Sequence, residues 1–307
     1  MTTLPLNAKL AGKYNLVVKH ADGSTTETGW FDNLILDSGL DLVGLGTAVQ
    51  FSFVGAGAST PVASQAQLDS QIGGYGSFTF TGVSSVNSGS PNYVATLTWP
   101  FHWAQGAVVG NVSEIGIGPN TSGNGLFSRA LILDNVGSPT TLSLVSTDQL
   151  TAYYALSFTP NTSDTTGSVV IAGVTYNYTM RLANAASFVS SYPYLVATSG
   201  AIGILQASQV YVYGSDATLG PITGQPSASS SAYGCTVTPA SYGNGTYHLD
   251  NVLSMTISQC NVTGGIKAIL LPFATGSSIV YKVLFDTPIP KTALNTLSLT
   301  FRFAWSA

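Results

Sequence analysis

Charged residues are scarce in this sequence. Nine basic and thirteen acidic residues make up 7 % of the 307 positions and give a net charge of −4, whereas about 25 % is typical of a soluble domain. Hydrophobic residues reach 45 %, which excludes a disordered chain, because disorder combines low hydrophobicity with high charge. The sequence also has no cluster of Lys and Arg that could neutralise phosphates, so we expect no nucleic-acid partner.

Long apolar runs and cysteines are also lacking. No uninterrupted apolar run approaches the ~18 residues of a spanning helix, so we expect no membrane insertion. Residues 1–18 lack the compact apolar region of a signal peptide. Two cysteines, Cys235 and Cys260, are too few for a disulfide framework. Their spacing neither supports nor excludes one bridge, and we favour two small buried side chains.

The familiar catalytic motifs are absent. G-x-S-x-G, G-x-G-x-x-G and the P-loop do not occur, which removes sequence support for an α/β-hydrolase or a nucleotide-binding protein. His20, His102 and His248 stand far apart without an H-E-x-x-H motif. A metal site built from Cys235, His248 and Cys260 has no C-x-x-C pair to anchor it. We therefore expect no metal, no cofactor and no catalytic site.

Alternation of apolar and polar residues runs through the whole chain. Short period-2 segments rich in β-branched and aromatic residues are separated by Gly, Pro, Asn and Ser, which is typical of antiparallel sheets. They predict an all-β fold, a β-sandwich or jelly roll. The main segments are 13–19, 78–83, 93–103, 150–158, 168–182, 209–213, 253–257, 279–285 and 297–304.

Two short helices are the most that the sequence predicts. Asp37 or Ser38 could cap one that runs through Leu42 and Val43. Ser59 or Thr60, with Pro61 in the first turn, could start another that reaches about residue 71. Neither segment sustains a period of 3.6 residues.

The chain could divide into two lobes. Alternation lapses at residues 184–194, so we place a boundary between an N-terminal β lobe, 1–187, and a C-terminal β lobe, 188–307, although a single unit remains an alternative. Residues 214–247 are rich in Gly, Ser and Pro and predict long exposed loops. Tyrosines in this region could stack on sugars or simply pack between strands. They are Tyr192, Tyr194, Tyr211, Tyr213, Tyr233, Tyr242 and Tyr247.

The few charges are unevenly distributed. Residues 1–19 and 267–307 hold seven basic residues and one acid, a balance of +6, while residues 20–266 hold two basic and twelve acidic residues, a balance of −10. Chance clustering is one interpretation. The other is electrostatic docking, in which Lys267, Lys282 and Lys291 are exposed and face an acidic patch on a neighbouring subunit.

Acidic residues allow two further hypotheses. Glu114 lies in an apolar strand context and is predicted to pair with Arg129, a structural role. Glycoside hydrolysis needs two carboxylates at a set separation, and Glu114 and Asp134 are the candidates for it. Five acids between residues 22 and 41 are spaced for turns and helix caps rather than for a Ca²⁺ loop. They are Asp22, Glu27, Asp32, Asp37 and Asp41.

Several segments together resemble a family of tailed-bacteriophage virion proteins, described as tail, tail-fibre or structural proteins. The segments keep their order over nearly the whole chain. They are GWFDNLILDSGLDLVG (29–44), VGAGASTP (54–61), GNVSEIGIG (110–118), LFSRALILD (126–134), GSPTTLSLVSTDQLTAYYALSF (137–158) and TPIPKTALNTLSLTFRFAWSA (287–307).

This resemblance implies a non-enzymatic virion component of the tail or adsorption apparatus. Such a protein assembles in the host cytoplasm as a homo-oligomer, binds other virion proteins and can take part in host attachment through a surface glycan. The resemblance carries over no catalytic or binding residue. The alternatives from other classes are a surface-polysaccharide hydrolase and a non-catalytic carbohydrate-binding module.

Overall fold

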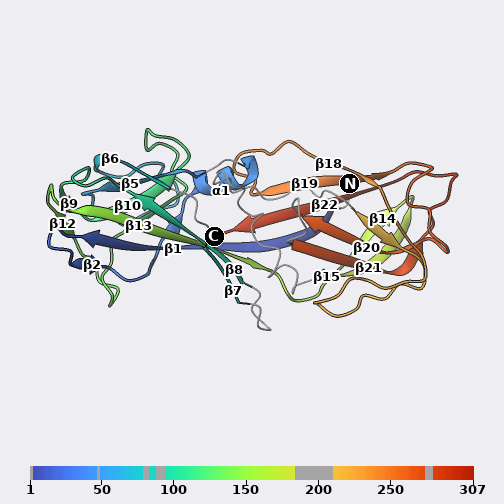
Figure 1. Cartoon of the computed structure of the whole chain (residues 1–307). Coiled ribbons are helices and arrows are strands. Elements are labelled where there is room, and N and C mark those ends of the chain that lie inside the picture. The colour runs from blue at the N-terminus through green and yellow to red at the C-terminus, as the bar shows by residue number, and fades with distance from the viewer. Residues whose placement is uncertain (1–2, 47–48, 79–82, 88–93, 184–209, 274–278) are drawn as a thin grey trace.

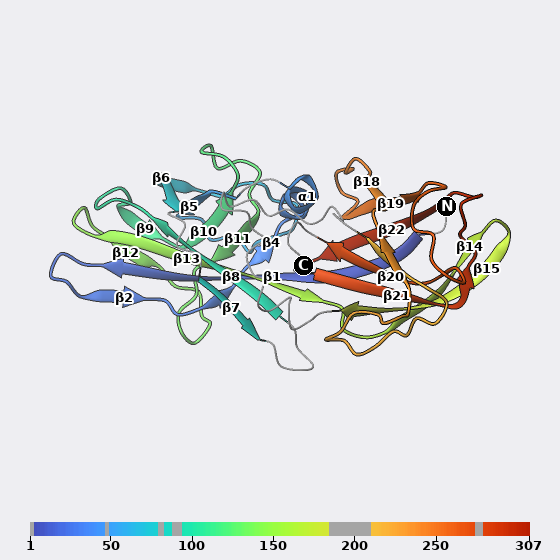
Figure 2. The ribbon, with the colours of Figure 1, turned by 45° about the vertical axis from the view of Figure 1, so that its right-hand side comes forward.

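The fold is all-β, as predicted. In the computed structural model, which describes residues 3–46, 49–78, 83–87, 94–183, 210–273 and 279–307, strands account for 54 % of the described residues and helix for 4 %. The sheets curl and pack in a sandwich-like arrangement. Figures 1 and 2 show an elongated molecule in which β1 runs lengthwise through the middle.

One sheet of fourteen strands forms the frame. Strands β2 (Thr25–Glu27) and β3 (Phe31–Asp32) pair with its strand β1, and β7 (Val83–Asn87) pairs with β8. The remaining strands follow one path: β18 (Thr236–Pro239), β19 (His248–Met255), β22 (Leu297–Ser306), β1 (Thr3–Lys19), β13 (Gln149–Pro160), β8 (Val94–His102), β6 (Gln71–Phe78), β5 (Phe51–Gly55), β10 (Glu114–Gly118), β11 (Ser128–Leu131) and β4 (Leu34–Ile35).

Strand β1 shows why the alternation forms a sheet. Its even-numbered side chains, among them Leu6, Leu10 and Leu16, are buried, while Lys9 and Lys13 on the odd-numbered face are exposed. This is the pattern that pleating imposes when one face meets a core. β1 pairs antiparallel with β13 over twelve residues and parallel with β22. The parallel pairing joins the two ends of the chain and departs from the antiparallel expectation.

A second sheet of six strands packs against the first. Residues of both sheets, such as Leu6, Met180, Val283 and Leu299, belong to one continuous buried cluster. A separate pair is formed by β9 (Gly110–Val112) and β12 (Leu142–Leu144). The order of the second sheet is β14 (Thr165–Ile171), β15 (Val174–Ala183), β21 (Ile279–Ile289), β20 (Ile266–Phe273), β16 (Tyr211–Tyr213) and β17 (Ser231–Tyr233).

The first predicted helix is confirmed as α1 (Asp37–Leu45), which ends at Gly46 in the left-handed conformation. The predicted cap is wrong, because Leu36 is the N-cap residue and the Ser38 hydroxyl donates to the Leu126 carbonyl. Gly39 lies so close to the carbonyl of Phe127 that any side chain there would collide with it. On another side of the helix, the Trp305 indole donates to the Leu40 carbonyl at 2.9 Å. The helix therefore connects the region before β11 with the end of β22.

The second predicted helix is wrong. Residues 59–70 form turns and bends rather than a helix. Backbone N–H groups of Ser59, Asp69 and Ser70 donate to the carboxylates of Asp69 and Glu114 instead of to carbonyls four residues back. Local propensity is thus overridden by the buried carboxylate of Glu114, which needs donors, and by the contact of Ser59 with Asp69.

The predicted boundary between residues 187 and 188 lies outside the described residues and stays a prediction. On its N-terminal side, β14 and β15 belong to the same sheet as β20 and β21. On its C-terminal side, β22 pairs with β1. In the part of the chain that the structure describes, no helix is long and apolar enough to span a membrane.

Candidate functional site

Glu114 and Arg129 form a fully buried ion pair, as predicted. Their neighbouring strands β10 and β11 place Arg129 Nε 2.9 Å from Glu114 Oε2, and both side chains are 0 % exposed. The same carboxylate accepts backbone N–H groups from Gly57, Asp69 and Ser70. A buried carboxylate is tolerated only with such partners, because burial removes its water.

The remaining donors of Arg129 bind the loop that covers this pair. One terminal nitrogen donates to Asp69 Oδ2 and the other to Gln65 Oε1, each at 2.7 Å. The Ser59 hydroxyl, together with the charge of Arg129, holds the pKa of Asp69 below its usual value. Sequence reasoning identified the pair but missed Asp69, Gln65 and Ser59, which lie 60 or more residues from Arg129.

The two carboxylates considered for glycoside hydrolysis both have structural partners. Glu114 is enclosed, and its oxygens accept the donors just described. Asp134 Oδ1 accepts the backbone N–H groups of Val136 and Ser138 at 3.0 and 2.8 Å, which closes a turn after β11. The enclosure of Glu114 keeps its carboxylate away from a sugar, whereas Asp134 is partly exposed.

The acids between residues 22 and 41 also serve turns and contacts within the chain. Asp22 accepts the backbone N–H of Ser24 at 2.8 Å. Asp37 lies in the first turn of α1, where negative charge is favourable. Asp41 accepts the hydroxyl of Tyr242 at 2.6 Å. No group of three or more potential metal ligands occurs among the described residues.

The fold places the three histidines apart from one another, each with its own partner. His20 Nδ1 lies 3.0 Å from Asp148 Oδ1, His102 contacts Thr151 and His248 contacts its own loop. Our preference for two unlinked buried cysteines is wrong, because Cys235 and Cys260 form a disulfide. The hypothetical metal site would need these two thiolates, and the disulfide removes both.

The prediction that the terminal lysines share an exposed docking face is contradicted for two of the three. Lys282 is 0 % exposed and donates to the carbonyls of Pro221 and Gly224. Lys291 is 2 % exposed and donates to Asn261 Oδ1 at 2.8 Å. Lys267 is partly exposed.

The physical reason for the burial of Lys282 is a covering loop. Alternation places Lys282 of β21 on the face of its sheet opposite the main core. Residues of the segment that follows β16, such as Ala217 and Ala228, cluster with Leu270 and Leu284 on that outer face. Part of the turn-rich segment that we predicted to be exposed therefore covers the sheet and encloses the lysine.

Two of the tyrosines considered for sugar stacking pack within the chain. Tyr213 is 8 % exposed, and Tyr242 packs on the Trp305 ring with centroids 5.6 Å apart. Tyr192 and Tyr194 lie outside the described residues. Ordinary packing therefore accounts for Tyr213 and Tyr242. Tyr211 is partly exposed and lies opposite Tyr233 in the pairing of β16 with β17, so sugar stacking stays a prediction.

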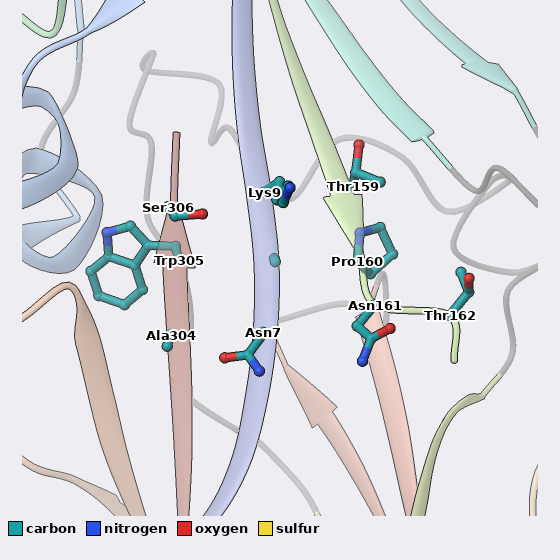
Figure 3. A pocket seen from close by; sticks show the side chains of 10 residues that line it. Asn7, Lys9, Thr159, Pro160, Asn161, Thr162, Ala304, Trp305 and Ser306 are labelled. Carbon is teal, nitrogen blue, oxygen red and sulfur yellow. The ribbon is translucent and has the colours of Figure 1, made fainter. Parts of the chain in front are cut away.

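A groove with a mixed polar and apolar lining crosses β13, β1 and β22 and is the candidate binding surface (Figure 3). Its volume is about 480 Å³. Thr159, Lys9 and Ser306 lie side by side in register across the three strands, while the Trp305 ring points away from β1 toward α1 (Figure 3). The lining residues are Asn7, Ala8, Lys9, Thr159, Pro160, Asn161, Thr162, Ala304, Trp305 and Ser306.

The groove offers amide and hydroxyl groups with one ionisable side chain, Lys9. Such a surface can hydrogen-bond an uncharged polar partner. The lining of the groove includes no carboxylate. Sequence reasoning missed the groove because the parallel pairing of β1 with β22 has no local signal.

Comparisons of this chain with protein-family models, with curated proteins and with solved structures find no match.

Proposed function

We propose that this chain is a structural component of a phage virion, belonging to the tail or adsorption apparatus, and that it acts by assembling with other virion proteins and with further copies of itself. The sequence segments that resemble tail and tail-fibre proteins support this proposal. The structural observation that carries the proposal is that charged side chains pair within the chain. Arg129, Arg181 and Arg302 each bind a carboxylate of the same chain.

A surface left to uncharged polar and apolar groups suits permanent contact. The cores of lasting interfaces are depleted in charged residues, and the groove over β1, which has one ionisable side chain in its lining, follows that composition. Exposed apolar side chains such as Val136 and Leu294, 79 % and 93 % exposed, add to the surface available for contact. The function proposed is therefore mechanical, with sheets that hold shape while their surfaces bind neighbours.

The direct test is detection of the chain in purified particles. Lysates of the host that expresses the gene are fractionated on a density gradient, and the particles are analysed by mass spectrometry and by immunogold electron microscopy. We expect the chain in the particle fraction at a fixed ratio to other virion proteins, with label at the tail. Recovery of the chain only in the soluble fraction would overturn the proposal.

A parallel assay addresses the enzymatic alternative. The purified chain is incubated with host surface polysaccharide, with Glu114→Gln as the matched variant. The proposal expects no release of reducing ends by either protein. Turnover that disappears in Glu114→Gln would replace the structural role with hydrolysis, and saturable binding without turnover would favour a carbohydrate-binding module.

A further inference from the structure

Strand β14 forms the outer edge of the six-stranded sheet. It pairs with β15 on one side, and within the described chain no strand pairs with its other side. Its seven residues, TTGSVVI, include no charge and no proline. Natural edge strands normally carry charged residues or proline, because the free N–H and C=O groups of an edge would otherwise pair readily with another strand.

Other edges of the described sheets are shorter or blocked. β4 has two residues and β17 has three. β18 has four residues and ends at Pro239, and proline lacks the N–H needed for pairing. β14 is therefore the longest unprotected edge among these strands.

The hairpin geometry fixes which groups of β14 point outward. Ala172 and Gly173, with φ values of 49° and 81°, form a two-residue turn that closes on the pair Ile171 and Val174. In an antiparallel pair, hydrogen-bonded and non-hydrogen-bonded residues alternate. The backbone groups of Thr166, Ser168 and Val170 then face away from β15. Figure 2 shows this hairpin at one end of the molecule.

We propose that β14 pairs antiparallel with β14 of a second copy of this chain, about a two-fold axis at Ser168. In this register Ser168 faces Ser168 of the second copy, and Thr166 faces Val170. The N–H and C=O groups of these three residues form six hydrogen bonds across the axis, and the two six-stranded sheets become continuous.

The sequence of β14 favours a second copy over an unrelated partner. The strand is self-complementary about Ser168, since the exposed residues Thr166, Ser168 and Val170 meet one another on one face, and β-branched residues pair well across strands. The absence of charge removes the repulsion that identical strands would otherwise feel. Val170, 56 % exposed in the single chain, becomes covered. This inference rests on the proposed function, because it names the contact through which copies assemble.

Disulfide cross-linking tests the register. Ser168→Cys places two cysteines opposite each other with Cα atoms about 5.5 Å apart, within the range that a disulfide spans. Thr166→Cys is the matched control on the same strand and face, because the two introduced cysteines would lie roughly 13 Å apart along the strands. The native cysteines are bonded to each other and provide no competing thiol.

We expect Ser168→Cys to form a covalent dimer under mild oxidation and Thr166→Cys to remain monomeric on a non-reducing gel. The double variant Thr166→Cys/Val170→Cys should also cross-link. Equal cross-linking by both single variants would overturn the proposed register. Absence of cross-linking in Ser168→Cys would overturn the pairing itself.

Self-association in solution gives an independent readout. Ser168→Pro removes an outward N–H that β15 does not use, and Ser168→Ala retains it. We expect Ser168→Pro, but not Ser168→Ala, to weaken dimer formation at least about tenfold in sedimentation equilibrium, as loss of one or two hydrogen bonds would. Circular dichroism checks that both variants fold. Parent protein that is monomeric at every concentration would overturn the proposal.

The experiments can distinguish failure of the β14 pairing from failure of the proposed virion role. If the chain is found in particles while Ser168→Cys stays monomeric, the edge pairing fails and the virion role stands. If Ser168→Cys cross-links while the chain is absent from particles, the reverse holds. The parent chain could also be monomeric alone and yet lose its incorporation into particles when Val170→Lys is introduced. In that case the edge binds a different protein, which overturns the second-copy proposal.

Discussion

Each of the two large sheets holds a cation with 0 % exposure, Arg129 in one and Lys282 in the other, and the partners of these two cations differ. Arg129 in the main sheet is enclosed by two carboxylates, those of Glu114 and Asp69. Lys282 in the six-stranded sheet donates to two backbone carbonyls, those of Pro221 and Gly224. Both side chains are 0 % exposed, so burial alone does not explain how each charge is stabilised.

The difference shows in protonation. Burial and the nearby charge of Arg181 lower the pKa of Lys282 to about 8, while Asp164 partly opposes the shift. Carbonyl dipoles compensate an ammonium group less than a carboxylate compensates a guanidinium group. Lys282 can therefore lose its proton within an accessible pH range.

The largest effect is expected from removing the cation that faces carboxylates. Arg129→Met keeps an apolar stem but leaves Glu114 buried without its counter-ion, so the free energy of unfolding should fall by about 3–5 kcal/mol. Urea denaturation followed by circular dichroism measures the change. Arg302→Met is the control, because its pair with Asp250 is partly exposed, 38 % and 24 %, and such pairs contribute at most about 1 kcal/mol. Equal losses in both variants would show that burial of the Arg129 pair does not matter.

A disulfide bond links two residues near the six-stranded sheet. Cys235 and Cys260 close a loop with a sequence separation of 25. The double variant Cys235→Ser/Cys260→Ser should lose roughly 3 kcal/mol of unfolding free energy, because an unlinked unfolded chain has more conformations. The reduced parent protein should match it. If reduction leaves the urea midpoint unchanged, the disulfide does not constrain the unfolded chain.

Removing the cation that faces carbonyls should cost less. Lys282→Met leaves the Pro221 and Gly224 carbonyls without a donor but strands no opposite charge, so a loss of about 1–3 kcal/mol is expected. Equilibrium urea denaturation at pH 7 measures it beside Arg129→Met. A loss larger than that of Arg129→Met would reverse the comparison.

The same variant tests the pH dependence. A lysine whose pKa is lowered on folding binds fewer protons in the folded state, so stability rises as the pH increases from about 8 toward 10.5. The parent protein should gain stability relative to Lys282→Met in that interval. Measurements should stop near pH 10, because burial raises the pKa of Tyr14 and Tyr154 and stability then falls as the pH rises further. A constant difference between the two proteins from pH 7 to 10 would show that Lys282 does not titrate there.

Sequence patterns predicted what depends on local alternation. The segment 150–158 lies within β13, and 168–182 lies within the β14–β15 hairpin. The burial of Lys282 was not predictable in this way, because it depends on a covering loop some sixty residues earlier in the chain. The failure of the predicted helix from residue 59 to about residue 71 has the same origin, since the carboxylate of Glu114, on the distant strand β10, takes its donors from this segment.

The candidate contacts were predicted only in part. The pairing of Glu114 with Arg129 followed from two isolated charges in apolar strands of adjacent segments. The groove over β1 depends on Lys9 meeting Ser306 across a parallel pair that joins the ends of the chain, and no short-range pattern reports such a register. The disulfide likewise joins loops that only the folded sheets bring together.

A double-mutant cycle on Glu114 and Arg129 tests most directly the central claim that the few charges of this chain act as internal structural pairs. Unfolding free energies are measured for the parent, Glu114→Gln, Arg129→Met and the double variant. We expect the double variant to lose less than the sum of the single losses, with a coupling energy of about 2 kcal/mol or more, because each single change strands a buried partner. A coupling energy near zero would contradict the account.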